Sequence, residues 1–430
     1  MKQPKITLVE LPPTSFGKLN GERVKDIYTR FKLPARANPL LHAILVDTGK
    51  YEDVKSINPN LSADAKLTQE DFDRIFESDY LLLSSITRTI PQTKELAELY
   101  HKNKPDGKVI VGGHHVTFLP EEALEWADVV VRGEGDKTLL EVLQSFETKK
   151  SLKGIKGISY RQVKNIFHES DRELLTSQEL SDLPIPYFPK VINTSRGCPH
   201  SCNFCSIVQF FKGTYRRRNN DSILNELKSS GSMSIFFGDD NFAVNKRETR
   251  NLLERIISEG LNNKDYYYQL DVNSAFTYPR ENSIDEDFIK LLKRAGGFSV
   301  FLGLESINEE TLKQYGKSAS VERNKLAVKA FRDAGLWVHG MIIVGSDSDT
   351  NKSLEELSEW AKENLDSVQY FALTPLPGTP LTKEMEKQGR IISKDYNLYD
   401  GFHILINPKN FPPYELQMKI VNMHKDFYSF

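Results

Sequence analysis

The sequence predicts an α/β protein with three parts: a doubly wound, Rossmann-like amino-terminal domain, a partial (β/α)6 TIM-like barrel and a small, mostly helical carboxyl-terminal region. Three observations support this fold class. Apolar runs alternate with amphipathic runs in the first third of the chain, a proline-rich stretch follows over 183–189, and a second alternating series begins at Val191. Strand–helix alternation is typical of parallel sheets, and a proline biases the residue before it toward extended backbone. The proline-rich stretch therefore marks a domain boundary.

The elements of the first domain follow from apolar patterning. Thr68 and Asp71 predict a capping box that opens a helix over Glu70–Glu77. Further helices are expected over Pro91–Lys102 and Glu121–Trp126, each near a proline that suits a first turn. The strands between them are expected over Ile6–Leu11, His42–Asp47, Asp79–Ile86, Lys108–Gly112 and Asp128–Arg132.

A second strand series builds the predicted barrel. Gly154–Val163 is expected to form a hairpin before it, and Asp287–Ala295 has the apolar spacing of an amphipathic helix within it. We expect four regions: a first domain over 1–148, a hairpin and linker over 149–189, the barrel over 190–378 and the helical region over 379–430. The barrel strands are expected over Lys190–Thr194, Ser234–Gly238, Tyr267–Asn273, Ser299–Glu305, Val338–Val344 and Ser367–Thr374.

Composition and charge exclude several classes of protein. The 430 residues suffice for roughly two or three domains, and 39% hydrophobic with 27% charged residues is typical of a globular protein. No apolar run approaches the roughly 18 residues of a membrane span, and the amino terminus lacks the apolar core of a signal peptide. A formal charge of −2 provides no basic field for nucleic acid. We therefore expect a cytoplasmic protein with neither a membrane nor a nucleic-acid partner.

All three cysteines, Cys198, Cys202 and Cys205, lie within eight consecutive residues after the first barrel strand. An odd, tightly spaced set is a poor disulfide framework and a good metal-binding one. Soft thiolates select zinc or iron–sulfur clusters, and three thiolates can hold three irons of a 4Fe–4S cluster while the fourth stays open. The alternatives are a structural zinc site with His200 as fourth ligand, and buried inert cysteines.

The Cys-x3-Cys-x2-Cys spacing resembles the signature of the radical S-adenosylmethionine (SAM) superfamily, and the resemblance extends from Lys190 to about Pro377. It implies a 4Fe–4S cluster and SAM as cofactors. Taken singly the SAM motifs are weak, since Asp239 and Asp240 could be helix caps and Gly345 a turn. By this resemblance the SAM site comprises Phe204 and Ile343 with Gly345 near the adenine, Gly238-Asp239-Asp240 near the amino group, Glu305 and Ser306 near the ribose or amine, and Asn273 as a further polar contact.

The amino-terminal domain resembles the cobalamin-binding domain of one subfamily. Three strand-end segments carry the likeness, and a purely architectural α/β domain is the alternative. The Asp-x-His-x-x-Gly motif, whose histidine binds cobalt, is absent, so the lower cobalt face would meet a residue such as Thr87 or Arg88. The residues that the resemblance assigns to cobalamin are Ser84, Ser85, Thr87, Gly112, Gly113, Gly133, Glu134 and Gly135.

Two further features have open interpretations. Arg216-Arg217-Arg218 is expected to be a solvated face, or, from the resemblance, a basic patch near the cysteine loop. His403 is expected to be a packing histidine or a substrate contact.

The resemblance implies a cobalamin-dependent radical SAM C-methyltransferase that acts through a 5′-deoxyadenosyl radical and methylcobalamin. Its substrate would be a peptide, protein or small molecule, and a flavodoxin- or ferredoxin-type protein would supply single electrons. The first alternative is a related enzyme that catalyses a cyclisation or rearrangement, and another is a non-catalytic sensing module. A methylthiotransferase would need three further cysteines in its first domain, and the chain has three in all.

Overall fold

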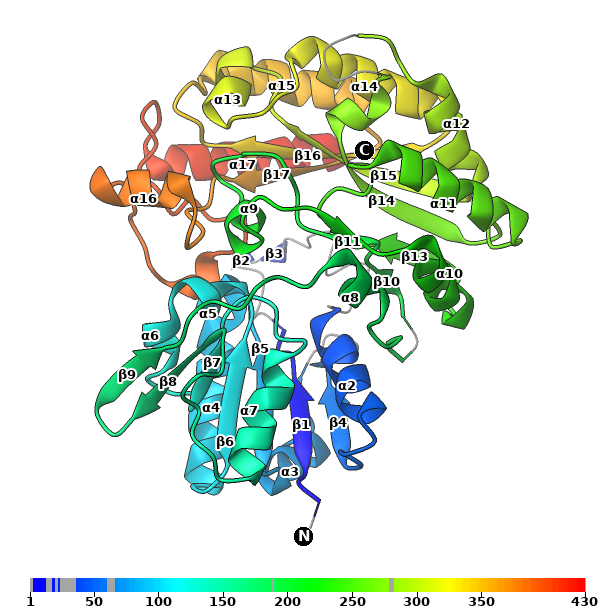
Figure 1. The fold of residues 1–430 in the computed structure, drawn as a ribbon. Helices are drawn as coiled ribbons and strands as arrows, with labels where there is room; N and C mark the ends of the chain where they lie inside the picture. Colours follow the sequence, from blue (N-terminus) through cyan, green and yellow to red (C-terminus); the bar gives the residue numbers. More distant parts are fainter. Residues whose placement is uncertain are drawn as a thin grey trace. The chain divides into compact units, whose positions relative to one another are not determined.

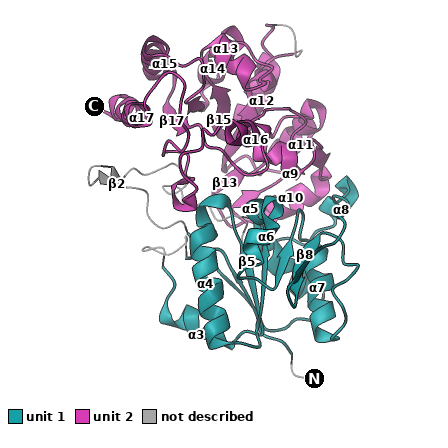
Figure 2. Cartoon of the chain, turned by 90° about the vertical axis from the view of Figure 1, so that its left-hand side faces the viewer, with its two compact units in different colours: residues 1–187 teal, residues 188–430 magenta. Residues whose placement is uncertain are grey.

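The computed structural model describes residues 3–12, 18–19, 22–23, 36–59, 66–187, 189–277 and 282–429. The chain forms two compact units, residues 1–187 and 188–430, and Figures 1 and 2 show their elements. The two units are described separately below.

Unit 1 is built on a seven-stranded sheet in the order β4-β1-β5-β6-β7-β8-β9. The first five strands in this order run parallel, whereas β8 and β9 form a hairpin that adds antiparallel to β7. The winding reverses between β1 and β5, and ligands of such sheets bind beyond the carboxyl ends of the strands at that reversal. The strands are β1 (Ile6–Val9), β4 (Val54–Ile57), β5 (Tyr80–Ser84), β6 (Lys108–Gly112), β7 (Val129–Val131), β8 (Ile158–Gln162) and β9 (Asn165–His168), with a separate pair, β2 (Lys18–Leu19) and β3 (Glu22–Arg23).

Helices cover both faces of the unit 1 sheet. Figure 2 shows α3 and α4 on one face and α7 on the other, which is the predicted doubly wound arrangement. The predicted capping box is confirmed, because Thr68 accepts from the Asp71 amide while the Asp71 carboxylate accepts from the Thr68 amide. The helices are α2 (Ala37–Asp47), α3 (Gln69–Glu77), η2 (Thr87–Thr89), α4 (Ile90–Asn103), α5 (His114–Phe118), α6 (Pro120–Ala123), α7 (Thr138–Glu147) and α8 (Ser177–Ser181).

One prediction for unit 1 is wrong, and one strand was not predicted. The strand expected over His42–Asp47 is the second half of helix α2. Asn38, Ile44 and Leu45 are buried at helical spacing there, and a short apolar run by itself does not distinguish a strand from a buried helix. The strand β4, which the sequence analysis did not predict, lies at the sheet edge and has a mixed polar sequence.

Unit 2 contains a six-stranded parallel sheet whose strand order follows the chain order, β10-β13-β14-β15-β16-β17. Each neighbouring pair is joined by a helical crossover, as the predicted partial barrel requires. The six predicted strands are confirmed, and no strand end differs from its predicted position by more than two residues. Their bounds are β10 (Val191–Ile192), β13 (Ser234–Phe237), β14 (Asp265–Asp271), β15 (Gly297–Glu305), β16 (Trp337–Val344) and β17 (Ser367–Ala372), with a short hairpin of β11 (Ser195–Arg196) and β12 (Arg216–Arg217).

Most helices of unit 2 cover the outer side of this sheet (Figure 1). The predicted helix over 287–295 is confirmed as α12, with Asp285 as its cap. The helices are α9 (Ser206–Phe210), α10 (Asn220–Ser229), α11 (Lys246–Ser258), η3 (Val272–Ala275), α12 (Glu286–Arg294), α13 (Glu309–Gln314), α14 (Val321–Asp333), α15 (Asn351–Asn364), α16 (Pro380–Lys387), η4 (Tyr396–Leu398) and α17 (Pro413–Tyr428).

The carboxyl-terminal helix α17 covers the edge strand β17. The Tyr428 hydroxyl donates to the carbonyl oxygen of Val368 at 2.8 Å and accepts from its amide at 3.0 Å. His424 Nε2 accepts from the Tyr370 amide at 3.2 Å. An edge strand presents unpaired amides and carbonyls, and here side chains of α17 satisfy several of them.

Candidate functional site

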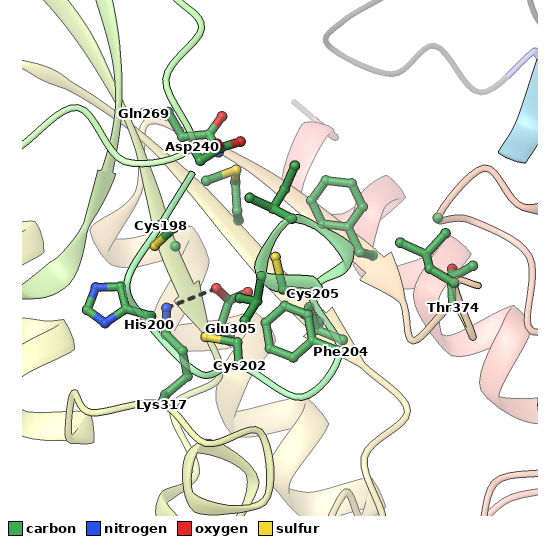
Figure 3. Close-up of a pocket in the computed structure, with 18 of the residues that line it drawn as sticks. Cys198, His200, Cys202, Phe204, Cys205, Asp240, Gln269, Glu305, Lys317 and Thr374 are labelled. Carbon is green, nitrogen blue, oxygen red and sulfur yellow. Dashed lines mark hydrogen bonds and ion pairs between the residues drawn. The ribbon is translucent and has the colours of Figure 1, made fainter. Parts of the chain in front are cut away.

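The three cysteines lie on the loop between β11 and α9, at the carboxyl end of the barrel sheet. Cys198, Cys202 and Cys205 are half-buried, form no disulfide and line one pocket (Figure 3). Cys205 is also the residue at which α9 begins. The chain therefore presents three soft donors to a single cavity.

Two aspartates after β13 fix the start of the cysteine loop. Asp239 is buried, and its carboxylate accepts from the Thr194 amide at 3.1 Å and the Thr194 hydroxyl at 2.8 Å. Asp240 Oδ2 accepts from the Gly197 amide at 2.9 Å. Gly197 has φ of +85°, and a Cβ there would lie 2.2 Å from the Thr214 carbonyl oxygen. A glycine is thus required one residue before the first cysteine.

The segment after α13 supports the other half of the loop. Asn203 Nδ2 donates to the Gln314 carbonyl at 2.9 Å, and the Asn203 amide donates to the Tyr315 carbonyl at 3.3 Å. The Phe204 ring meets the Tyr315 ring edge-on, with centroids 5.3 Å apart. The loop is therefore held on both sides before any ligand binds.

Burial raises the pKa of all three thiols, so they are protonated at neutral pH when no ligand is bound. It raises the pKa of Cys198 to about 11 and of Cys202 to about 12, and it also raises the pKa of Cys205. A cysteine binds a metal as the thiolate, so metal binding by these three residues would release protons. Within the described ranges, no three His, Cys, Asp or Glu side chains are arranged to hold a single metal ion. A donor set of three spaced thiolates fits a cluster.

A charged centre lines the same pocket as the thiols. Lys317 Nζ lies 3.2 Å from Glu305 Oε1 and 3.4 Å from Asp271 Oδ2, and all three side chains are close to fully buried. Burial opposes the charge on Lys317, but Glu305 and Asp271 outweigh it and raise the Lys317 pKa. Burial also opposes the charge on Asp271, yet Lys317 and His200 hold its pKa below the usual value. Burial raises the pKa of Glu305. Two carboxylates around one ammonium leave the centre negative when all are ionised, which suits a ligand with a cationic group.

The rest of the pocket wall is mainly apolar. Part of it comes from the inner faces of the last two strands and the chain after β17, and part from the start of α9. The carboxyl-terminal segment 399–401 closes one side, tied to β17 by the bond from the Ala372 amide to the Gly401 carbonyl. The apolar lining residues are Phe204, Ile207, Val208, Leu270, Met341, Ile343, Phe371, Ala372, Leu373 and Leu376.

The structure brings together some of the residues expected from the sequence. Phe204, Asp240, Glu305 and Ile343 line the same pocket as the three cysteines. The other expected SAM contacts do not line it. Those residues are Gly238, Asp239, Asn273, Ser306 and Gly345.

The residues that do not line the pocket form hydrogen bonds with neighbouring residues. Asn193 Nδ2 donates to the Gly238 carbonyl. Asn273 donates to the Ser318 hydroxyl and accepts from Arg323. Their contacts support the strand ends around the pocket.

The backbone of Gly345 is fixed in the same way. Gly345 donates its amide to Asp349 Oδ2 at 2.7 Å, and its φ is +116°. Ser306 is buried and its hydroxyl accepts from the Asn308 amide at 3.1 Å.

The arginine run lies beside the cysteine loop. Arg216 and Arg217 pair with β11, directly before the loop, and Arg218 is buried with its guanidinium 2.5 Å from Glu226. The expectation of a solvated face is therefore wrong for Arg218. His403 pairs with Asp400 at 2.9 Å, and Asp400 lines the pocket.

In unit 1 the residues assigned to cobalamin gather at the carboxyl ends of β5, β6 and β7. Gly113 has φ of +120°, and a Cβ there would lie 2.1 Å from the Ser85 carbonyl oxygen. The Ser85 amide donates to the Gly112 carbonyl at 3.0 Å. The two strand ends therefore approach each other more closely than any side chain on Gly113 would permit.

Hydroxyls and backbone groups fill the same edge. Buried Ser85 bonds to the Thr89 hydroxyl at 3.0 Å, and Thr87 is buried beside it on η2. The Gly133 amide donates to Thr117 Oγ1 at 3.0 Å. Glu134 accepts from the Leu175 amide at 2.7 Å. Ser84 ends β5, and Gly135 follows Glu134 in the loop after β7.

Comparison with known proteins decides the family. Residues 192–408 match the radical SAM superfamily. The chain belongs to that superfamily. Residues 51–143 match the B12 binding domain, so the radical SAM barrel follows a cobalamin-type domain. These matches bear out the expected fold class and the expected cofactors: a 4Fe–4S cluster, SAM and cobalamin.

Individual relatives agree with this assignment. An uncharacterized methyltransferase of Pyrococcus horikoshii is 28% identical over 100% of this chain and 93% of its own length. An anaerobic magnesium-protoporphyrin IX monomethyl ester cyclase of Cereibacter sphaeroides is 26% identical over 83% of this chain and 60% of its own length. The solved structure of TsrM, a radical SAM methyltransferase of Kitasatospora setae with cobalamin and a 4Fe–4S cluster bound, matches with a TM-score of 0.71 at 17% identity, over 90% of this chain and 75% of that one. The expectation of an enzyme of the methyltransferase class is therefore supported.

Across the ranges that the structure describes, no helix combines the length and apolarity needed to cross a bilayer.

Sequence reasoning missed two members of the charged centre. Asp271 ends β14, two residues before the expected contact Asn273, and the rule that functional groups follow strand ends could have found it. Lys317 lies twelve residues after Glu305 between two helices, where no motif marks it.

Proposed function

We propose that this protein is a cobalamin-dependent radical SAM C-methyltransferase that methylates an unactivated carbon of a peptide, protein or small-molecule substrate. The observation that carries the proposal is the single pocket shared by three cysteine thiols and the Asp271–Lys317–Glu305 centre. Together the bound cofactors supply a hydrogen-abstracting carbon radical and a transferable methyl group.

Each group of pocket residues has a role in this proposal. Cys198, Cys202 and Cys205 hold three irons and leave the fourth open to SAM. In this proposal the Lys317 ammonium, which lines the pocket, holds the SAM carboxylate, and Glu305 accepts from the ribose or amine. Asp240, Phe204 and Ile343 complete the SAM contacts. Gly238, Asp239, Asn273, Ser306 and Gly345 then act by shaping the strand ends around the pocket.

The unit 1 edge holds cobalamin in this proposal. Gly112, Gly113, Gly133 and Gly135 let the cofactor approach the backbone, since they present no side chain. Ser84, Ser85, Thr87 and Glu134 offer hydroxyl and carboxylate partners at the same strand ends.

The apolar wall of the pocket suggests where the reacting carbon of the substrate binds. A radical that abstracts hydrogen from carbon must be kept from water, and the apolar side chains of Met341, Phe371 and Leu373 line the cavity. We expect the reacting carbon to enter along this wall, with Tyr399 and Asp400 contacting its polar part. A flavodoxin- or ferredoxin-type protein would supply electrons.

A second candidate is a cobalamin-dependent radical SAM cyclisation or rearrangement. The likeness to the magnesium-protoporphyrin IX monomethyl ester cyclase favours it. The two candidates share every cofactor and differ in whether a methyl group leaves SAM.

Product stoichiometry separates them. Anaerobically reconstituted protein is incubated with SAM labelled with deuterium in its methyl group, dithionite, methylcobalamin and a metabolite and peptide extract of the source organism. Methylation predicts 5′-deoxyadenosine and S-adenosylhomocysteine in about equal amounts together with a labelled product. 5′-Deoxyadenosine formed without S-adenosylhomocysteine would contradict methylation and favour the cyclase. Cys202→Ala protein is the control and should give neither compound.

A further inference from the structure

Glu305 occupies a strained backbone conformation at the end of β15. Its φ is +58°, which side-chain-bearing residues rarely adopt. The Ser306 amide donates to the Leu304 carbonyl at 2.7 Å, so Glu305 is the central residue of a three-residue γ-turn. The form with positive φ is the rarer and more strained of the two γ-turns. Such strain persists only where the surrounding structure enforces it.

The turn changes where the carboxylate lies. β15 pairs Gly303 with Met341, so a regular strand would place residue 305 opposite Ile343. The observed register places Glu305 opposite Ile342, one residue nearer to the amino end of β16. Glu305 Oε1 then lies 3.0 Å from the position that a Cβ on Gly303 would occupy, and 3.2 Å from Lys317 Nζ.

Asn324 on α14 clamps both sides of this turn. Its Nδ2 donates to the Leu304 carbonyl at 2.9 Å and to the Ser306 carbonyl at 2.8 Å. The side chain is completely buried. Its Oδ1 has no hydrogen-bond partner among the described residues, so the side chain acts here through its two donated hydrogen bonds. It does not line the pocket.

We propose that Asn324 is a positioning residue: its two hydrogen bonds hold Glu305 in the strained turn, so that the Glu305 carboxylate lies against Lys317 at the SAM site. The assignment of that site to SAM rests on the proposed function, whereas the clamp on the turn does not. A residue that only filled the core would affect stability in every background equally.

A stability cycle on the full-length chain tests the clamp without cofactors. The variants are Asn324→Leu, Glu305→Gly and the two combined, and the readout is the urea midpoint. Glycine adopts positive φ without strain, so Asn324→Leu should lower the midpoint by clearly less in the Glu305→Gly background than in the wild type. Equal losses in both backgrounds would overturn the proposal. Should Asn324→Leu protein not fold, Glu305→Gly must still be more stable than Glu305→Ala, and the reverse order would overturn it.

SAM affinity tests the consequence at the site. In reconstituted protein, Asn324→Leu should weaken SAM binding about tenfold while leaving iron content unchanged, and in a Glu305→Gln background it should weaken binding less than about twofold. Asn364→Leu is the matched control, because Asn364 donates to the Trp360 carbonyl on α15, outside the pocket. Equal weakening in both backgrounds would show that Asn324 does not act through Glu305. If the wild-type protein binds no SAM, the proposed function fails. The urea denaturation experiment still tests whether Asn324 holds the strained turn, because it needs no cofactor.

Discussion

The two candidate binding edges are built by opposite means. In the unit 2 pocket, ionisable side chains are buried against one another: three thiols, and Lys317 between Asp271 and Glu305. At the unit 1 edge, glycines and hydroxyls bring backbone groups together, as in the 2.1 Å approach that excludes a Cβ on Gly113. The difference indicates that unit 2 works through charge and donor chemistry, whereas unit 1 works through shape. Removing a functional group should damage the first, and adding a methyl group should damage the second.

The largest effect is expected from Cys202→Ala. Losing one of three thiolates should remove the cluster and reduce SAM cleavage by at least about a thousandfold, since the reaction has no other electron entry. Iron content, the visible spectrum and 5′-deoxyadenosine formation measure this. Cobalamin binding should persist in the variant. If cobalamin binding were lost together with the cluster, the two sites would not be independent, which would contradict the comparison.

Gly113→Ala should produce the complementary result. The added methyl group clashes with the Ser85 carbonyl oxygen and the residue must keep φ near +120°, so cobalamin affinity should fall by about tenfold or more while the cluster remains. Cobalamin titration with iron analysis measures both. Gly231→Ala is the control, because an added Cβ there meets nothing within 4 Å. Unchanged cobalamin binding in Gly113→Ala protein would contradict the shape-based account of unit 1.

Lys317→Met should have a strong effect confined to the pocket. It leaves two buried carboxylates without their ammonium, so SAM affinity should fall by about ten- to a hundredfold and the chain should lose stability. The cluster should still assemble, because its three thiolates remain. SAM titration of the reduced protein measures the first effect and urea denaturation the second. If the variant bound SAM as tightly as the wild type, Lys317 would not contribute to the SAM site.

The smallest effect is a pH dependence at the barrel edge. The Tyr370 amide can only donate, so His424 Nε2 must be unprotonated, and burial lowers the His424 pKa. The unfolded chain binds the proton first as pH falls below about 6.5, so stability should decline by up to about 1.4 kcal/mol per pH unit for this residue. Urea unfolding between about pH 7 and 5 measures the slope. His424→Gln should make the slope smaller, and an unchanged slope would exclude a contribution from His424.

The sequence predicted the barrel better than the amino-terminal domain. Most of the barrel strands contain the buried apolar runs that parallel sheets favour, and the structure retains all six predicted strands. In unit 1 the apolar run over 42–47 proved helical, and the polar edge strand β4 carried no apolar pattern. Short runs and edge strands take their structure from tertiary packing, which local pattern does not encode.

In the candidate site, too, the residues that depend on tertiary packing could not be predicted from local sequence pattern. The cysteines, Phe204 and Glu305 could be predicted because they sit in a motif or at a strand end. Lys317 could not, since a lysine in a loop is ordinarily solvated and only the fold brings this one between two carboxylates. The strained φ of Glu305 was equally invisible, because it depends on Asn324, nineteen residues further along the chain.

Iron and sulfide analysis of the anaerobically reconstituted protein, combined with electron paramagnetic resonance of the reduced form, tests the central assignment most directly. The three-thiolate pocket predicts about four irons and four sulfides per chain and a 4Fe–4S spectrum that shifts when SAM is added. Bound zinc without a brown chromophore, or a cluster spectrum that SAM leaves unchanged, would contradict it.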